Sequence, residues 1–128
     1  MIIITFGTFD LLHVGHIKIL ERAKSLGDKL VVGISTDNFS FKKKNRYPIY
    51  DQESRKKILE SLRFVDEVFF EESFEKKREY IQKYNADIFV MGNDWEGKFD
   101  EFNDVCNVVY FERTPSISTT QIIEKISN

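Results

Sequence analysis

The sequence lacks the features that mark several large classes of protein. Its 128 residues contain one cysteine, Cys106, which excludes an internal disulfide framework and a cysteine zinc cluster and is compatible with a reducing compartment. No apolar run approaches the roughly 18 residues of a transmembrane helix, and no basic leader precedes the first apolar residues. Neither the GxGxxG dinucleotide fingerprint nor the GxxxxGKS/T phosphate loop occurs. We therefore expect a cytoplasmic protein with no membrane partner.

The charged residues are numerous but nearly balanced in sign. They make up 31% of the chain, yet the formal net charge is only -2, so the overall charge does not favour a nucleic-acid partner. The hydrophobic fraction of 41% is that of an ordinary globular protein, and 128 residues can bury a core without disulfides. Because there is no internal repeat, low-complexity tract or linker, we expect one domain spanning residues 1–128.

Strand-like and helix-like patterns alternate along the chain. Short apolar runs rich in β-branched residues indicate buried strands, and apolar residues at helical spacing indicate helices between them. This alternation predicts an α/β fold, a single Rossmann-like, doubly wound sheet of about five mostly parallel strands with helices on both faces. The expected strands are residues 2–4, 29–35, 65–70, 87–92 and 107–111, and the expected helices are residues 17–26, 52–62 with Asp51 as N-cap, 74–84 and 119–126.

The most informative segment is GTFDLLHVGH, residues 7–16, between the first expected strand and the first expected helix. In a parallel sheet such a turn lies where ligands bind, and the free N–H groups of the helix start favour an anion. Gly7 would allow a tight turn, and Gly15 would leave room for a phosphate between two imidazoles. A lone histidine at a helix start is usually a polar cap. The chain's two histidines, His13 and His16, both fall in this turn, which favours a functional role.

This segment resembles the GxFDxxHxGH motif of the HxGH nucleotidyltransferases. The resemblance implies that the segment binds a nucleoside triphosphate and that its histidines stabilise the phosphoryl group being transferred. Class I aminoacyl-tRNA synthetases share an HxGH-like signature, but 128 residues leave no room for a tRNA-binding domain. We therefore assign catalytic roles to His13 and His16, and nucleotide binding to Gly7, Thr8, Phe9, Asp10 and Gly15, with Asp10 fixing the turn rather than acting as a base.

Residues 36–50 form the one long connection, which we expect to be irregular. It carries a cationic cluster directly after a strand. Such a cluster is either a solvated surface loop or a lid that folds over phosphates and excludes water, and a triphosphate at the neighbouring turn favours the lid. Among the cations Lys42, Lys43, Lys44 and Arg46, we choose Lys43 as catalytic because it lies nearest the lysine that glycerol-phosphate cytidylyltransferases carry in this loop.

Residues 63–68 resemble the RYVDEV stretch of the same cytidylyltransferases. The resemblance implies that Arg63 lies near the phosphates or a subunit interface and that Asp66 lies near the active-site mouth. Both residues could instead cap elements or form ion pairs at the surface.

Residues 91–99 closely resemble MGxDWEGKF in that family, with Asn93 at a position that is often Asp. The resemblance implies that Asp94 lies beside the nucleotide, although a Gly-Asn-Asp cluster after a strand is already a good turn. Trp95 follows that turn at the same sheet edge as the histidines, where it could stack on a base or shape a pocket.

Residues 113–121 form the last informative segment. Ser118 with Gln121 makes a capping-box pattern, which predicts a second helix N-terminus at the carboxyl edge of the sheet. The segment also resembles the RTxGIST signature of cytidylyltransferases, with Ser116 in place of the usual glycine. The resemblance implies that Arg113 is catalytic, offsetting charge on the phosphates, and that Thr114, Ser118 and Thr119 bind the nucleotide.

The resemblance to glycerol-3-phosphate cytidylyltransferases covers nearly the whole chain. It implies transfer of CMP from CTP to a small alcohol phosphate, glycerol 3-phosphate above all, with release of pyrophosphate and no covalent intermediate. It also implies a homodimer and Mg²⁺ bound to the triphosphate, while the sequence shows no dedicated metal cage. The product, CDP-glycerol, would supply the synthesis of teichoic-acid-like or capsular polymers.

Three alternatives remain open at this point. The same transfer could use phosphoethanolamine, phosphocholine or a capsule precursor as acceptor. ATP-using relatives that act on sugar phosphates also carry FDxLHxGH and a later STT, so adenylyl transfer is a second alternative. The third is a catalytically silent regulator that binds CTP and releases no pyrophosphate, against which the intact His13, His16 and Arg113 argue.

Overall fold

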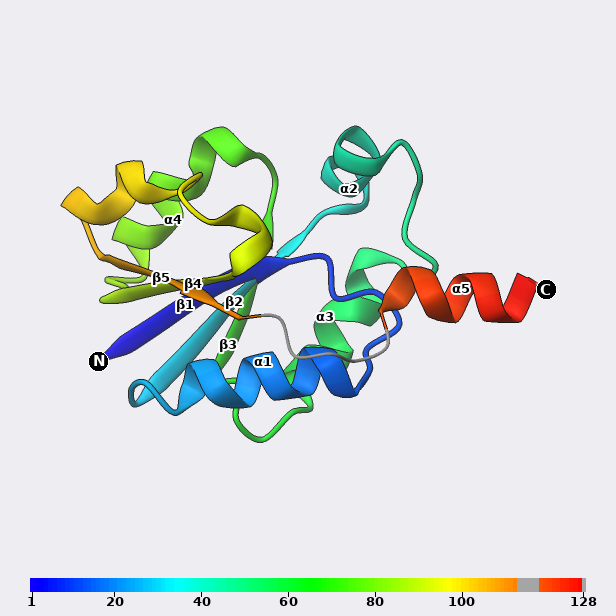
Figure 1. Ribbon diagram of the computed structural model, residues 1–128, viewed down its shortest axis with the longest axis horizontal. Coiled ribbons are helices and arrows are strands. Elements are labelled where there is room, and N and C mark those ends of the chain that lie inside the picture. The colour runs from blue at the N-terminus through cyan, green and yellow to red at the C-terminus, as the bar shows by residue number, and fades with distance from the viewer. Residues whose placement is uncertain (113–117, 128) are drawn as a thin grey trace.

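Five parallel strands form one sheet in the computed structural model of the protein, which describes residues 1–112 and 118–127 (Figure 1). The strand order is β3-β2-β1-β4-β5, and every neighbouring pair is parallel. The predicted α/β fold is therefore confirmed. The strands are β1 (Ile2–Gly7), β2 (Lys29–Ser35), β3 (Glu67–Glu71), β4 (Ile88–Gly92) and β5 (Asn107–Phe111).

The chain winds in both directions from the central strand. β2 and β3 follow on one side of β1, and the chain then crosses to the other side, where β4 pairs with β1 and β5 pairs with β4. The carboxyl ends of β1 and β4 therefore flank the point where the winding reverses, which is where open parallel sheets bind their ligands.

Helices cover both faces of the sheet, as predicted (Figure 1). α1 (Val14–Lys24) and α3 (Gln52–Glu60) lie on one face, where Leu20 and Leu59 are fully buried against the strands. α4 (Lys77–Lys83) lies on the other face, preceded by the 3-10 turn η1 (Phe74–Lys76). The turns η2 (Asn93–Trp95) and η3 (Asp100–Asp104) follow β4. The core of this second face is largely aromatic and includes Phe6, Phe69, Phe89, Phe99 and Phe102.

The connection that was expected to be irregular contains a helix, α2 (Asp37–Lys44). Its N-cap is Thr36, whose side chain accepts a hydrogen bond from the Phe39 N–H at 3.1 Å. Its C-cap is Asn45, which adopts the left-handed conformation with φ of 57°. The expectation was wrong because only Phe39 and Ser40 are buried in this helix. Its sequence therefore lacks the apolar residues at helical spacing by which a helix is predicted.

The other elements start and end within a few residues of the expected positions. Asp51 caps α3 as predicted, since its Oδ1 accepts the Ser54 N–H at 2.8 Å. The helix expected at 74–84 begins as the 3-10 turn η1 and continues as α4, and the strand expected at 65–70 begins two residues later. Such shifts are normal at frayed element ends.

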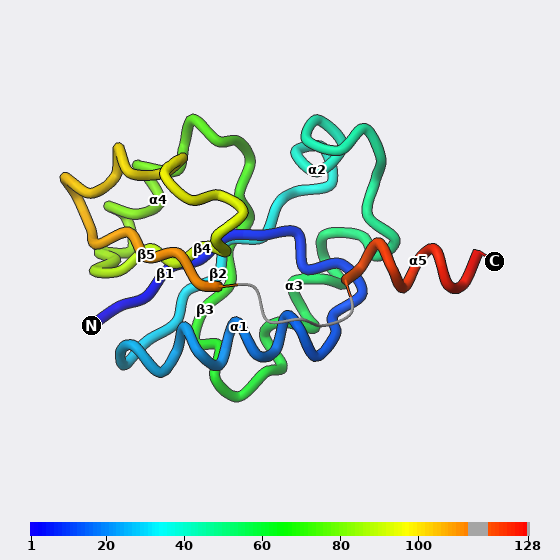
Figure 2. The backbone as a smooth tube through the Cα atoms, in the orientation of Figure 1, coloured from blue at the N-terminus to red at the C-terminus, as the bar shows by residue number. Residues whose placement is uncertain are grey.

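The last helix, α5 (Thr119–Ser127), projects from the body of the protein, and none of its residues is buried (Figure 2). The predicted capping box holds its start. The Gln121 N–H donates to Ser118 Oγ at 3.1 Å, and the Ser118 N–H donates to Gln121 Oε1 at 2.9 Å. Across residues 1–112 and 118–127, no helix is both long and apolar enough to cross a membrane.

The aromatic core predicts the effect of one small substitution. A Cβ atom on Gly33 would lie 2.7 Å from ring atoms of both Phe6 and Phe69, which are buried and pack edge to face. We expect Gly33→Ala to lower the free energy of unfolding by about 1–3 kcal/mol, the usual cost of overpacking. Urea unfolding measures it. Gly92→Ala is the matched control, because a Cβ there meets nothing within 4 Å, and equal losses in the two variants would contradict the explanation.

Candidate functional site

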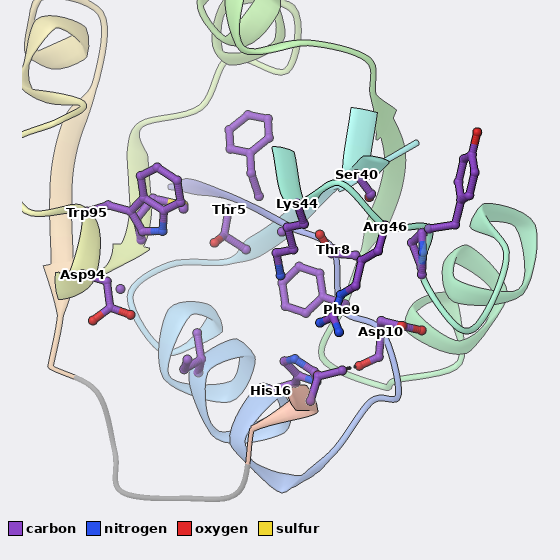
Figure 3. Close-up of a pocket in the computed structure, with 18 residues that line it drawn as sticks. Thr5, Thr8, Phe9, Asp10, His16, Ser40, Lys44, Arg46, Asp94 and Trp95 are labelled. Carbon is purple, nitrogen blue, oxygen red and sulfur yellow. Dashed lines mark hydrogen bonds between the residues drawn. The ribbon is translucent and has the colours of Figure 1, made fainter. Parts of the chain in front are cut away.

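A pocket opens at the carboxyl ends of β1 and β4 (Figure 3). It is lined by the end of β1 and the turn after it, by α1, by α2 and the segment after it, and by β4 with η2. Thr119, at the start of α5, also lines it. Both predicted helix N-termini, those of α1 and α5, therefore lie at one site, whose free N–H groups favour an anion.

The turn after β1 has an unusual backbone. Phe9 and Leu11 adopt positive φ angles of 52° and 48°, which are rare and strained for residues other than glycine. The Phe9 ring lies directly over Gly7, where an added Cβ would come within 2.8 Å of it. The predicted need for glycine at position 7 thus has a specific cause, and Gly7, Thr8 and Phe9 all line the pocket.

The Asp10 carboxylate holds this turn in place. It accepts hydrogen bonds from the N–H groups of Ile49 at 2.6 Å, Tyr50 at 3.0 Å and Leu11 at 3.1 Å. The Asp10 carbonyl accepts a further one from Thr119 Oγ1 at 2.8 Å. Its oxygens are occupied in structural contacts, and the residue is only 7% exposed, which agrees with the interpretation that Asp10 fixes the turn rather than acting as a base.

The two histidines form a reciprocal cap at the start of α1. His13 Nδ1 accepts the Gly15 N–H at 3.0 Å, and His16 Nδ1 accepts the His13 N–H at 3.2 Å. Their rings stack with centroids 3.9 Å apart. The stacked rings leave no space between them for the phosphate that was expected there. Gly15, which was expected to provide that space, is buried in the first turn of α1.

These contacts determine the protonation of both rings. Because each Nδ1 accepts a hydrogen bond, the proton of each neutral ring lies on Nε2, which can therefore act as a donor. Burial, with a smaller repulsion from His13, lowers the pKa of His16 to about 4, and burial also lowers the pKa of His13. Both rings are therefore neutral hydrogen-bond donors near pH 7. His16 lines the pocket (Figure 3), and the His13 ring stacks on that of His16.

The cations of α2 and the segment after it divide between two places. Lys44 and Arg46 line the pocket across from His16 (Figure 3). Lys43, the predicted catalytic lysine, instead lines an adjoining pocket, where its Nζ donates to Ser35 Oγ at 2.6 Å and lies 4.5 Å from the centre of the Phe39 ring. Burial lowers the pKa of Lys43 to about 8.

The adjoining pocket shares six lining residues with the first one: Phe6, Gly7, Thr8, Lys44, Met91 and Trp95. Its far side holds Lys77 and Glu71, whose side chains are 3% and 1% exposed and form an ion pair. Burial lowers the pKa of Lys77 and raises that of Glu71, and each shift is opposed by the attraction between the two groups. Three lysines, Lys43, Lys44 and Lys77, and the Glu71 carboxylate therefore line this adjoining pocket.

Most of the remaining predicted residues reach the first pocket. Asp94 and Trp95, on η2, line it, and Trp95 also separates it from the adjoining pocket. Thr119 lines it, while Ser118 caps α5 beside it. Arg113 and Thr114 lie outside the described residues.

The two residues singled out by the RYVDEV resemblance, Asp66 and Arg63, lie near the amino end of β3. The Asp66 carboxylate accepts the Leu30 N–H at 2.7 Å and pairs with Lys24, so it ties together the amino ends of β2 and β3 rather than lying at the active-site mouth. Arg63 is exposed in the segment that leads into the same end of β3 and does not line the pocket. The prediction for Asp66 is therefore wrong, because parallel strands bring only their carboxyl ends to the site. The expected place of Arg63, near the phosphates or at a subunit interface, stays a prediction.

Sequence reasoning missed three buried charged residues near the site: Glu71, Lys77 and Arg55. Glu71 ends a strand at the same sheet edge as the histidines, and that position was a usable signal. Lys77 and Arg55 lie on helices among other charged residues, so no pattern distinguished them from a solvated helix face.

Comparison with known proteins agrees with this site. A family model described as Cytidylyltransferase-like matches residues 4–125, so the chain belongs to that family. It is 58% identical over 125 residues to the glycerol-3-phosphate cytidylyltransferase of Bacillus subtilis (strain 168), covering 98% of this chain and 96% of that protein. It is 50% identical over 125 residues to the glycerol-3-phosphate cytidylyltransferase of Staphylococcus aureus (strain NCTC 8325 / PS 47), covering 97% and 93%.

A solved structure supports the fold independently. The lipopolysaccharide core biosynthesis protein from Thermoplasma volcanium GSS1 superposes with a TM-score of 0.77 at 26% identity, covering 89% of this chain and 98% of that one. The family and the fold class expected from the sequence are both confirmed, and the chain is a nucleotidyltransferase.

The low pKa of His16 predicts a loss of stability in mild acid. In the unfolded chain this histidine is protonated below about pH 6.5, whereas in the folded chain it is protonated only below about pH 4. Because the unfolded chain binds the proton more readily, the free energy of unfolding decreases as the pH falls. Between pH 7.5 and 5.5 we expect this histidine to cost about 1 kcal/mol. His16→Gln keeps a capping side chain and removes the titration. Urea unfolding should therefore show a smaller acid loss for His16→Gln than for the wild type, and equal losses would contradict this account.

Proposed function

We propose that this chain transfers CMP from CTP to glycerol 3-phosphate, giving CDP-glycerol and pyrophosphate. Near-full-length relatives at 50% and 58% identity carry the name of this activity. The single structural observation that carries the proposal is the pair of adjoining cationic pockets at the carboxyl edge of the sheet, one for each phosphorylated substrate.

The first pocket suits the nucleotide. Its triphosphate would lie at the N-termini of α1 and α5, between His16 on one side and Lys44 and Arg46 on the other. Asp94 and Trp95 on η2 are placed to contact the nucleoside. Arg113 and Thr114 are proposed to bind the nucleotide on the resemblance alone.

The adjoining pocket suits the acceptor. A phosphate monoester is close to a dianion at neutral pH, and Lys43 with Lys77 offers two ammonium groups in a largely desolvated space, where their attraction for it is strong. Glu71 would accept hydrogen bonds from the hydroxyl groups of glycerol. The wall that both pockets share, at Gly7 and Thr8, would bring the acceptor phosphate next to the α-phosphorus of CTP.

The reaction needs no base. An ionised oxygen of the acceptor attacks the α-phosphorus in line, and the bond to the pyrophosphate oxygen breaks, so that the leaving group takes the electron pair. The protein's contribution is to hold two anions together and to stabilise the charge on the five-coordinate phosphorus. The Nε2–H groups of His13 and His16 can donate to its oxygens, and Lys43, Lys44 and Arg113 would offset its charge.

Mg²⁺ is part of this proposal as the partner of CTP. Its ligands would be mostly phosphate oxygens and water, as is usual when Mg²⁺ binds with a nucleotide. This fits the pocket, since the oxygens of Asp10 already accept three backbone N–H groups and two cations, Lys44 and Arg46, line it. We further propose a cytoplasmic homodimer whose product supplies teichoic-acid-like or capsular polymers, with the exposed Arg63 at the interface between subunits.

Pyrophosphate release tests the function directly. The purified chain with Mg²⁺ is given CTP or ATP, each with and without glycerol 3-phosphate, and we expect release only with CTP and glycerol 3-phosphate together. Release only with ATP would contradict the choice of base. CTP binding without turnover would contradict glycerol 3-phosphate as the acceptor, and a panel of other phosphates, including phosphoethanolamine and phosphocholine, would then identify it.

Removing one histidine should abolish most of the turnover. We expect His16→Ala to lower kcat by at least ~10²-fold, the usual effect of losing one transition-state donor. Circular dichroism checks that the variant is folded. Lys18→Ala, an exposed change on the same helix, should retain wild-type kcat. Near-normal turnover by folded His16→Ala would remove this histidine from the mechanism.

The lowered pKa of Lys43 predicts a loss of activity at alkaline pH. Because the pKa of Lys43 is about 8, this residue loses its charge above that pH in the free enzyme, and kcat/KM for glycerol 3-phosphate should fall there. Lys43→Arg keeps the charge at all accessible pH values, so its fall should move to higher pH. The profile is measured by pyrophosphate release from pH 7 to 10. Coincident profiles for the two enzymes would assign the titration to another group.

A further inference from the structure

Arg55 is buried as completely as any aliphatic residue of the core. It is 1% exposed overall, with a fully buried side chain, and it comes from the first half of α3. It lines neither of the two pockets, so it is not placed to touch a substrate there. Burying a guanidinium is costly unless its hydrogen bonds are satisfied, and a hydrophobic side chain of similar size is often at least as stable in such a position.

The guanidinium of Arg55 joins four segments of the chain. Its Nε donates to the Tyr50 carbonyl at 3.0 Å, and its Nη1 donates to the carbonyls of Thr8 and Ser35, both at 2.9 Å. Its Nη2 donates to Asp37 Oδ1 at 2.7 Å. One planar group therefore connects the turn after β1, the end of β2, the start of α2 and the segment that precedes α3.

These bonds hold the start of α2, whose other attachments include the Lys43 bond to Ser35 and the ring contact between Phe39 and Phe74. The helix stands apart from the sheet beyond the end of β2 (Figure 1), and only Phe39 and Ser40 are buried in it. At its base, Asp37 also exchanges hydrogen bonds with Gln52, at 2.9 Å and 3.3 Å, which ties α2 to the start of α3.

The segment after α2 is held from the opposite side. Asp10 accepts the N–H groups of Ile49 and Tyr50, and Arg55 donates to the Tyr50 carbonyl. Lys44 and Arg46 lie in the sequence between the attachment at Asp37 and the attachment at Ile49 and Tyr50. Both face the pocket across from His16 (Figure 3). The position of both cations therefore depends on how firmly Arg55 and Asp37 hold the base of α2.

We propose that Arg55, acting through Asp37 and Tyr50, is a positioning residue that sets the distance between the cations of α2 and the turn after β1, and so the affinity for the nucleoside triphosphate. The inference rests on the proposed function for the identity of that ligand. It assigns Arg55 a role in substrate binding without substrate contact, since the four bonds fix where Lys44 and Arg46 meet the phosphates.

The test is CTP binding by calorimetry with Mg²⁺ present, at a temperature where circular dichroism shows each variant folded. Arg55→Lys keeps the charge, but one ammonium cannot serve four acceptors spread around a guanidinium plane. We expect its Kd for CTP to rise at least 10-fold. We also expect its affinity to depend less on salt, because displaced cations make fewer charge contacts with the phosphates.

Leu59→Ala is the matched control. Leu59 lies one turn further along the same helix and is fully buried in the core, so its truncation destabilises α3 without touching the four bonds. We expect this variant to melt at a lower temperature and to bind CTP with the wild-type Kd and salt dependence. If folded Arg55→Lys also melts lower but binds CTP like the wild type, Arg55 is merely structural and the proposal is overturned.

A second variant keeps the test decisive if Arg55→Lys does not fold. Asp37 is 30% exposed at its side chain, and Asp37→Asn removes the charge that pairs with Arg55 and that also accepts the Gln52 N–H. A rise in Kd for CTP would support the proposal, and an unchanged Kd would overturn it. Wild-type chain that fails to bind CTP would overturn the proposed function and this inference with it, whereas wild-type binding with unchanged variants overturns the inference alone.

Discussion

Three backbone N–H groups converge on the Asp10 carboxylate, and the arrangement of the site depends on that convergence. The contacts hold Phe9 and Leu11 in a left-handed backbone that would otherwise relax, and this strained turn sets the direction in which α1 begins. The same residue receives Thr119 through its carbonyl and the segment before α3 through its carboxylate. One acidic side chain thus connects the parts of the chain that enclose the nucleotide pocket.

The lysines and arginines around the site differ in how deeply they are buried. Lys44 and Arg46 lie at the pocket wall, whereas Lys43 and Lys77 are desolvated among Phe39, Phe74 and the Glu71 carboxylate. A buried ammonium attracts an anion more strongly than an exposed one, but it must be held by a partner before the anion arrives. Glu71 and Ser35 supply those partners, which suits this pocket to the acceptor phosphate of the proposed reaction.

Much of this could be predicted from the sequence, and the reasons for the failures are physical. Local sequence patterns determine the strands, the Asp51 cap and the Ser118 capping box, so these features could be predicted. The helix α2 was missed because its caps, Thr36 and Asn45, enclose no apolar period. Asp66 was misplaced because a resemblance carries no information on which end of a strand faces the site. The burial of Arg55 depends on contacts between distant segments, which no local pattern records.

The neutral state of the stacked histidines has a consequence for the end of the catalytic cycle. A neutral N–H group is a dipole, and its attraction for an anion falls off with distance faster than that of an ammonium or guanidinium. In the proposed mechanism the imidazoles would therefore act on the five-coordinate phosphorus at short range and attract pyrophosphate only weakly once it has begun to move away. Under that mechanism the cations of α2 would oppose the departure of pyrophosphate more than the histidines do, so the rate of product release would depend on that helix.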